Sequence, residues 1–330
     1  MTKFIVTGSD GFIGNWLTKK LLDDGYSVIG VDNNIRGGRN TGDISHQNFL
    51  RLEINLCNIE QVRKITEFLA DDTIICHLAA YNGTNNFYDV PWDVLRNSSL
   101  PLVNIIDVIS SSKFRPKILY TGSSESYAET INQGMGVFPT AENIILSSGE
   151  LLNPRWSYAS AKTFGEYCLS AAHHQLGVDF LVARVHNIYG PRMGFNHFTS
   201  DIIKKLREGQ CILPGATETR TFCYISDAVD ALFKLINLDS TNWNQVFHVG
   251  SDEEISIIDA AATIADLMNL PRSRLIPKPS IAGSVHRRFP SIEKLRNATN
   301  YEPKVSFKSG MQKVIDWYTE EQIKLERDFR

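Results

Sequence analysis

The stretch TGSDGFIG, residues 7–14, decides the fold of this chain. It places Gly8, Gly11 and Gly14 three residues apart, after the apolar run KFIV (3–6) and before the amphipathic stretch FIGNWLTKKLLDD (12–24). Glycine permits a tight turn and a close backbone approach to a pyrophosphate, and the N-terminus of the following helix favours that negative charge. The sequence therefore predicts a strand, a phosphate-binding turn and a helix, in that order.

A carboxylate stands at the end of the next apolar run, YSVIGVD (26–32). In a strand–helix–strand unit of this spacing, Asp32 would accept hydrogen bonds from the adenosine ribose hydroxyls and would repel a 2′-phosphate. The pattern thus predicts NAD as the cofactor and disfavours NADP.

The alternation of apolar runs and amphipathic stretches continues along the chain. Further strands are predicted at NFLRLEI (48–54), TIICHLAA (73–80), PKILYTG (116–122), VDFLVARV (178–185) and QVFHVG (245–250), with helices near 59–70, 91–111 and 157–176. This alternation indicates an α/β fold, a doubly wound parallel sheet with helices on both faces. We expect residues 1–187 plus about 225–250 to form that domain, and about 188–224 with 251–330 to form a smaller, interleaved, more helical lobe.

Composition narrows the class of protein. The 330 residues carry a net charge of -3 without a run of like charges or a basic stripe, which argues against a nucleic-acid partner. We see no signal peptide and no apolar run of the roughly 18 residues that a membrane helix needs. The five cysteines lack CxxC spacing, so we expect reduced thiols, no metal site and a cytoplasmic protein.

Two polar motifs follow the glycine turn. RWSYASAK (155–162) places Tyr158 and Lys162 four residues apart, on one face of a predicted helix. A phenol has a pKa of about 10, and a nearby ammonium favours the phenolate, which can then take a hydroxyl proton. The second motif, GSSESYA (122–128), ends an apolar strand with three serines and a glutamate, which either turn the chain or meet a substrate.

Together these motifs resemble the extended short-chain dehydrogenase/reductase family, in its nucleotide-sugar epimerase, dehydratase and decarboxylase group. The similarity runs almost end to end and is carried by TGSDGFIG, VDN (31–33), HLAA (77–80), GSSESYA, YASAK (158–162), RVHNIYGPR (184–192), RTFCYISDAVDAL (220–232) and FHVGSDEEISI (247–257). The resemblance implies a Rossmann-type NAD domain, a lobe that binds a nucleotide sugar, and a homodimer formed through the helices near 91–111 and 157–176.

The resemblance also implies site residues. The cofactor would be bound by Gly8, Gly11, Phe12, Ile13, Gly14, Asp32, Asn33, Asn55, Leu56, Leu78, Ala79, Ala80, Asn97, Tyr158 and Lys162. Asn55 stands where the family usually has an aspartate that meets adenine, which weakens this contact without removing it. In the family the phenolate, here Tyr158, removes the proton of the sugar's C4 hydroxyl while hydride passes from C4 to NAD, giving a 4-keto sugar. Ser123 matches the residue that hydrogen-bonds the same hydroxyl.

The residues after Ser123 bear on the fate of the ketone. Glucose-type 4,6-dehydratases have an Asp–Glu pair there, whereas this chain has Ser124–Glu125. That triplet resembles UDP-glucuronate decarboxylases and GDP-mannose 4,6-dehydratases, and NPRWSYASAK (153–162) looks most like the bacterial decarboxylases. Asp32 disfavours the NADP that GDP-mannose dehydratases commonly use. Decarboxylation is therefore the first hypothesis. A 4-epimerase, a 4,6-dehydratase, a net NAD-dependent dehydrogenase and a non-catalytic NAD-binding relative stay open.

For a decarboxylase the resemblance implies that Glu125 lies near C5 of the sugar. It also implies that Arg220 either donates a proton after the carboxylate is lost or binds the diphosphate. Substrate contacts are also implied for Ser124, Asn187 and the arginine segment Arg287–Arg288. Three departures from the family remain: Ala128 replaces a glycine, Ser284 and Val285 stand where an acid is usual, and residues 129–152 match no substrate signature.

Overall fold

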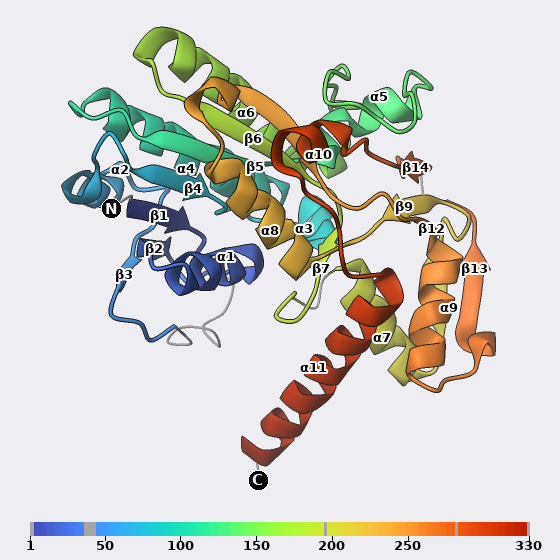
Figure 1. The fold of residues 1–330 in the computed structure, drawn as a ribbon. Coiled ribbons are helices and arrows are strands. Elements are labelled where there is room, and N and C mark those ends of the chain that lie inside the picture. The colour runs from blue at the N-terminus through green and yellow to red at the C-terminus, as the bar shows by residue number, and fades with distance from the viewer. Residues whose placement is uncertain (1–2, 36–43, 195–196, 281–282, 329–330) are drawn as a thin grey trace.

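The computed structural model describes residues 3–35, 44–194, 197–280 and 283–328, with side chains described up to residue 320 (Figure 1). Its centre is a seven-stranded parallel sheet in the order β11-β6-β5-β4-β1-β2-β3. The strands are β1 (Lys3–Thr7), β2 (Ser27–Asp32), β3 (Phe49–Glu53), β4 (Ile74–His77), β5 (Lys117–Ser123), β6 (Phe180–Val185) and β11 (Gln245–Val249). All seven predicted strands are confirmed. The chain reverses its direction of travel between β1 and β4, where ligands of open α/β sheets bind.

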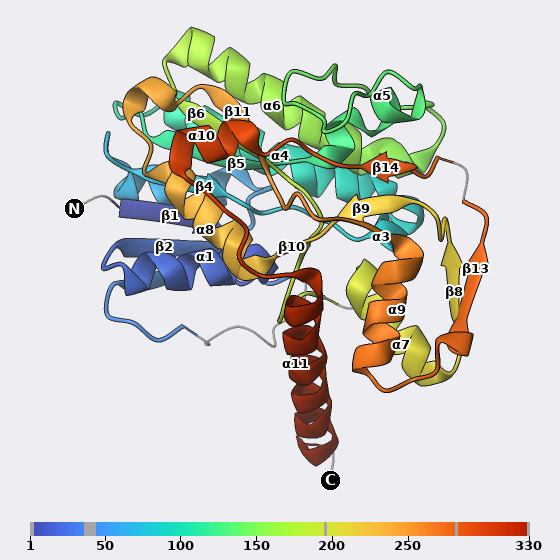
Figure 2. The ribbon, with the colours of Figure 1, turned by 45° about the vertical axis from the view of Figure 1, so that its right-hand side comes forward.

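Helices cover both faces of this sheet (Figures 1 and 2). One face carries α1 (Phe12–Asp23) and α8 (Ile225–Ile236), and the other carries α4 (Pro91–Ser110) and α6 (Ser157–Leu176). Strand β1 shows the period of two: Phe4 and Val6 join the core under α1, while Ile5 joins the opposite core. Residues 59–70 were predicted to be one helix. They form only one turn, α2 (Ile59–Val62), followed by a 3-10 helix (Arg63–Phe68).

The remaining elements lie outside the large sheet, mostly at one end of it (Figure 2). In the described part of the chain they include three small sheets as well as helices, and the sequence did not reveal the strands of these sheets. These elements are α3 (Thr84–Asp89), α5 (Ala128–Asn132), β7 (Ile188–Tyr189), α7 (Phe198–Glu208), β8 (Cys211–Pro214), β9 (Thr219–Thr221), β10 (Cys223–Tyr224), β12 (Glu254–Ser256), α9 (Ile257–Leu267), β13 (Leu275–Lys278), β14 (Arg287–Arg288), α10 (Glu293–Thr299) and α11 (Phe307–Asp328). Strand β14 runs parallel to β9 and sets Arg288 opposite Arg220.

The segment 129–152 is docked against β14 (Figure 1). Thr140 N donates to Phe289 O at 2.8 Å, and Ser291 N donates to Thr140 O at 2.7 Å. Ser147 N donates to Ser126 O at 3.0 Å, just beyond the end of β5. The segment therefore ties the carboxyl end of the sheet to the strand that carries Arg287 and Arg288.

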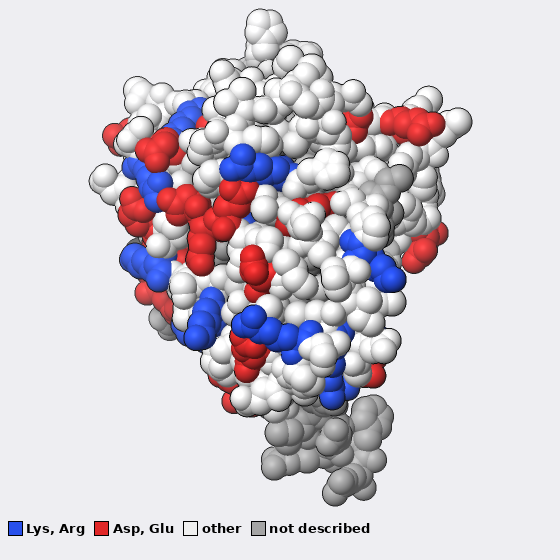
Figure 3. Space-filling model, turned by 90° about the vertical axis from the view of Figure 1, so that its right-hand side faces the viewer, with Lys and Arg blue, Asp and Glu red and all other residues white. Residues whose placement is uncertain are grey.

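The described surface mixes charges of both signs. Figure 3 shows basic and acidic side chains beside one another on the face that it presents. Within the described ranges, no helix combines the length and the apolar character that crossing a bilayer requires. Over the same ranges, no group of three or more His, Cys, Asp and Glu side chains is arranged to hold a metal ion. All five cysteines are free thiols.

Candidate active site

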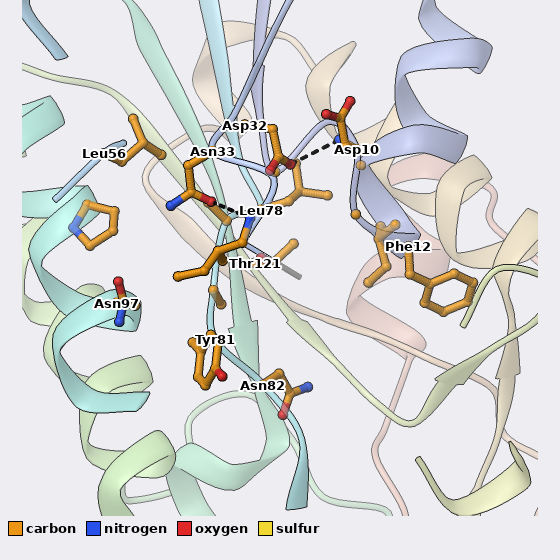
Figure 4. Close-up of a pocket in the computed structure, with 18 of the residues that line it drawn as sticks. Asp10, Phe12, Asp32, Asn33, Leu56, Leu78, Tyr81, Asn82, Asn97 and Thr121 are labelled. Atoms are coloured by element: carbon orange, nitrogen blue, oxygen red, sulfur yellow. Dashed lines mark hydrogen bonds between the residues drawn. The ribbon is translucent and has the colours of Figure 1, made fainter. Parts of the chain in front are cut away.

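A cleft of about 320 Å³ opens at the carboxyl ends of β1, β2, β4 and β5 (Figure 4). All fifteen residues predicted to bind the cofactor line it, from the glycine turn through Asn97 on α4 to Tyr158 and Lys162 on α6. Segments that are far apart in sequence therefore meet in one concave site. Figure 4 shows Leu56 and Asn97 facing this space from one side, with Asp32 beside the glycine turn.

The glycine turn leaves no room for side chains at two positions. Gly8 has φ +73°, and a Cβ there would lie 2.9 Å from Ala79 N at the end of β4. A Cβ on Gly14 would lie 2.0 Å from Gly8 O. The turn thus packs its backbone directly on α1 and on the chain after β4, which exposes the helix N-terminus to the cleft.

Asp32 is held at the end of β2 by the backbone. Its Oδ2 accepts from Asp10 N at 3.0 Å, and its Oδ1 accepts from Asn34 N at 2.8 Å. Partial burial raises the pKa of Asp32, and these two hydrogen bonds oppose the rise. A second carboxylate, Asp10, also lines the cleft and binds Arg51 through Nε at 2.9 Å and Nη2 at 2.7 Å. The Asp32 carboxylate at this end suits ribose hydroxyls and disfavours a phosphate, whereas Arg51 neutralises Asp10.

Tyr158 and Lys162 lie where the cleft meets the end of β5. Tyr158 is buried and stacks on Phe87 of α3, with ring centroids 5.2 Å apart and planes 12° apart. Lys162 Nζ donates to Thr121 O at 2.7 Å and lies 5.7 Å from the Tyr158 ring centroid. Burial lowers the pKa of Lys162 to about 7, although Glu166 opposes the shift. The pair has the proximity that an ammonium-assisted phenol requires.

A cluster of charged residues surrounds Glu125 just beyond the end of β5. Its Oε1 lies 2.6 Å from Arg288 Nη2, and its Oε2 lies 3.2 Å from Arg155 Nη1. Burial by itself would raise the pKa of Glu125, but Arg288 and Arg155 outweigh it and lower this pKa to about 2. Arg288 Nη1 also lies 3.5 Å from Ser124 Oγ. The 320 Å³ cleft is not lined by this cluster, which lies between the end of β5 and β14.

A model of the NAD dependent epimerase/dehydratase family matches residues 4–250. The chain belongs to this family. The membership makes it an NAD-dependent enzyme and confirms the resemblance on which the sequence argument rested. The glycine turn and the anchored Asp32 fit NAD, because the first provides backbone approach to the diphosphate and the second provides acceptors for the ribose.

Relatives of this epimerase/dehydratase family member carry several activities. UDP-glucuronic acid decarboxylase 1 of Danio rerio is 28% identical over 325 residues, covering 97% of this chain and 73% of that protein. UDP-N-acetyl-alpha-D-glucosaminuronate decarboxylase of Bacillus cytotoxicus is 27% identical over 329 residues, covering 96% and 97%. The solved structure of UDP-glucuronic acid 4-epimerase from Bacillus cereus with UDP-glucuronic acid and NAD has a TM-score of 0.83 at 22% identity, covering 97% and 99%. That structural likeness shows the Rossmann-type fold.

The other predicted site residues of this epimerase/dehydratase chain are more dispersed. Ser123 Oγ accepts from Glu125 N at 3.2 Å and so caps the 3-10 helix 124–127. Arg220 Nη2 pairs with Glu218 at 2.7 Å, not with Glu125. Asn187 Nδ2 donates to Thr221 O at 2.8 Å, and Arg287 pairs with Glu254 at 2.7 Å. The substrate roles of these residues stay predictions.

The contacts of two arginines with Glu125 do not follow from the sequence. The family resemblance implies a substrate contact for Arg288 and no role for Arg155. The PRW motif directly before the YASAK helix was the available signal for Arg155. The pairing of Arg288 with Glu125 had no local signal, because the two residues are 163 positions apart.

A side chain added to the glycine turn is expected to weaken NAD binding. Gly14→Ala puts a methyl group 2.0 Å from Gly8 O, so the turn must shift. We expect NAD binding to weaken by about tenfold or more and the melting temperature to fall, since overpacking costs about 1–3 kcal/mol. Titration calorimetry with NAD measures this. Lys19→Ala is the control, because Lys19 is exposed on the same helix, α1, and does not line the cleft. Equal NAD affinity in Gly14→Ala and in this control would contradict the prediction.

Proposed function

We propose that this enzyme acts on a nucleotide sugar and decarboxylates a UDP-linked uronic acid through a 4-keto intermediate. The observation that carries the proposal is the position of Glu125, which is held between Arg155 and Arg288 directly after β5. Relatives at 28% and 27% identity are named as decarboxylases of UDP-linked uronic acids. The presence of Ser124 in place of an acidic residue disfavours glucose-type dehydration.

NAD, Tyr158 and Lys162 have separate roles in the oxidation of the sugar at C4. NAD, when bound in the cleft, supplies a hydride acceptor for C4 and later returns the hydride. Tyr158 Oη takes the proton of the C4 hydroxyl, and the Lys162 ammonium favours the phenolate that does so. Burial of Tyr158 against Phe87 and of Lys162 against Thr121 keeps water from competing for this proton.

Carbon dioxide loss then follows from the ketone. The 4-keto uronic acid is a β-keto acid, so the C5–C6 bond breaks and its electron pair forms the enolate of C4 and C5. A proton must then reach C5. Arg288 contacts Glu125, the residue expected near C5, whereas Arg220 contacts Glu218. Arg288 is therefore the stronger candidate for the cation that stabilises the enolate. Arg220 remains a candidate for the diphosphate.

Other outcomes of the 4-keto intermediate have weaker support. A 4-epimerase would need no charged cluster beyond the strand end, and a glucose-type 4,6-dehydratase would need an acid where Ser124 stands. A GDP-mannose-type dehydratase shares the Ser–Ser–Glu triplet but commonly uses NADP, which Asp32 disfavours. A net dehydrogenase would accumulate NADH. A non-catalytic relative would not need both Tyr158 and Lys162, which this chain keeps side by side.

Mass spectrometry of a nucleotide-sugar panel tests the proposal. Purified protein with NAD is incubated with UDP-glucuronate, GDP-mannose, and UDP- and dTDP-hexoses. We expect UDP-glucuronate to lose carbon dioxide without net NADH formation. Loss of water from a hexose, or a new isomer of unchanged mass, would replace the decarboxylase assignment with a dehydratase or an epimerase.

We also propose that the enzyme is a homodimer that works in the cytoplasm. Helices α4 and α6 pack together and expose Trp92, Phe164 and Tyr167, which are 69%, 48% and 65% exposed. Large apolar side chains on two adjacent helices support an interface there. The cytoplasmic location rests on the sequence alone.

A further inference from the structure

The cluster around Glu125 carries an excess of positive charge. Among the described residues, Arg155, Arg220 and Arg288 pair with two carboxylates, Glu125 and Glu218, and each of these side chains is 16% exposed or less. The difference between three arginines and two glutamates is one positive charge. Burying an uncompensated charge is costly, so the site is most stable when an anion joins it.

Neighbouring acids do not supply the missing charge. Glu166 is bound to Arg184, with 2.7 Å between Oε2 and Nη2. Glu142 attracts Lys294, and its Oε1 accepts from His248 N at 2.9 Å. Glu254 is bound to Arg287. Each of these carboxylates therefore already has its own cation or donor.

The arginines also keep hydrogen-bond donors to spare. Among the described residues, Arg288 Nε is buried without a hydrogen-bond partner. The Arg155 side chain makes a single hydrogen bond in the described part of the chain, from Nη1 to Glu125. Its guanidinium lies over the Trp156 ring at 4.5 Å from the centroid, a contact that fixes its plane. A planar, fixed guanidinium with free donors is suited to a carboxylate.

The position of Arg155 places this cluster beside the elements that carry Tyr158 and Lys162. Arg155 lies in the 3-10 turn Pro154–Trp156, which leads directly into the α6 helix that carries Tyr158. Glu125 follows β5, and the backbone oxygen of Thr121 in β5 accepts a hydrogen bond from Lys162 Nζ. The cluster is therefore connected through the backbone to α6, which carries Tyr158 and Lys162, and to β5, which binds Lys162.

We propose that Arg155 is a substrate-binding residue that recognises the sugar carboxylate and so selects nucleotide-linked uronic acids over neutral hexoses. Arg155 and Arg288 then share their donors between Glu125 and the substrate, which supplies the negative charge that the cluster lacks. This inference rests on the proposed function, because it assumes that the substrate is a uronic acid.

The test compares two ligands that differ at C6, UDP-glucuronate and UDP-glucose, in binding to the full-length protein loaded with NAD. Every protein in the titrations carries Tyr158→Phe, so that UDP-glucuronate is bound without being consumed. Titration calorimetry then compares the otherwise wild-type protein with Arg155→Gln, Arg155→Lys and the control Arg63→Gln, whose arginine is 62% exposed and pairs with Glu60 in the described part of the chain. We expect the otherwise wild-type protein to prefer the uronate. Arg155→Gln should weaken UDP-glucuronate about tenfold to a hundredfold and change UDP-glucose by less than about twofold.

Arg155→Lys keeps the charge and should recover part of the loss, whereas Arg63→Gln should match the otherwise wild-type protein. Equal weakening of both ligands in Arg155→Gln would mean that Arg155 only supports Glu125, and this overturns the inference. An otherwise wild-type protein that binds both ligands alike also overturns it.

These titrations, set beside turnover of wild type with Tyr158 intact, separate this inference from the proposed function. If the otherwise wild-type protein prefers the uronate but wild type releases no carbon dioxide, the carboxylate site stands and the decarboxylase proposal fails. If wild type releases carbon dioxide while Arg155→Gln keeps full preference for the uronate, the proposed function stands and the role of Arg155 fails.

Discussion

Tyr158→Phe is expected to lower kcat by about 10²–10⁴-fold, because it removes the only group proposed to take the C4 hydroxyl proton. The phenyl ring keeps the stacking on Phe87, so folding and NAD affinity should stay close to wild type. Turnover of the substrate found in the nucleotide-sugar panel measures the first effect, and calorimetry with NAD measures the second.

Tyr167→Phe is the matched control for this experiment. Tyr167 lies on the same helix, α6, but is 65% exposed and lines no part of the cleft. It should keep wild-type turnover. A Tyr158→Phe enzyme that retained full activity would remove the phenol from the mechanism.

Glu125→Gln is expected to reduce turnover by about a hundredfold and stability by roughly 3 kcal/mol at pH 7. Removing one partner of a buried ion pair leaves the others uncompensated, here Arg155 and Arg288. The pKa of Glu125 falls from its ordinary value of 4.5 to about 2 in the folded protein, so its contribution is present above pH 4.5 and is lost as pH falls toward 2.

Denaturant unfolding of wild type and variant at several pH values tests the energetic part. The stability difference should be largest near pH 7 and should shrink as the pH is lowered toward 3. The exposed Glu60→Gln change, which breaks a pair that is 69% and 62% exposed, should cost less than about 1 kcal/mol. A difference that did not change with pH would show that ionisation of Glu125 is not its source.

The sequence allowed residues that line the cleft to be predicted because their signals are local. The turn between β1 and α1 has room only for glycine at positions 8 and 14, and Asp32 is the last residue of the next strand. The helix pair Tyr158–Lys162 needs only the i, i+4 relation. Each of these features is decided by neighbours in sequence, so its position in the structure follows from the strand–helix alternation.

The charged cluster could be predicted only in part, because its pairs are set by long-range packing. Strand β14 is two residues long, and its pairing with β9 decides that Arg288 reaches Glu125 while Arg287 turns to Glu254. Two adjacent residues on a strand, here Arg287 and Arg288, point to opposite sides. No pattern in the sequence indicated which of the two faces Glu125. The 3-10 helix at 63–68 shows the same limit, since the apolar period of residues 59–70 did not reveal the change of helix type after Val62.

The return of α8 and β11 to the large sheet also constrains how the protein is made. Strand β11 pairs with β6 although residues 186–244 separate them, and α8 comes from that same interval to cover the face that Phe4 and Val6 form. While a ribosome is still adding these residues, the nascent chain has an unpaired edge at β6 and a bare apolar face. Such surfaces favour aggregation until they are covered. A gene fragment that stops at residue 187 would therefore encode an aggregation-prone chain and not a minimal NAD-binding unit.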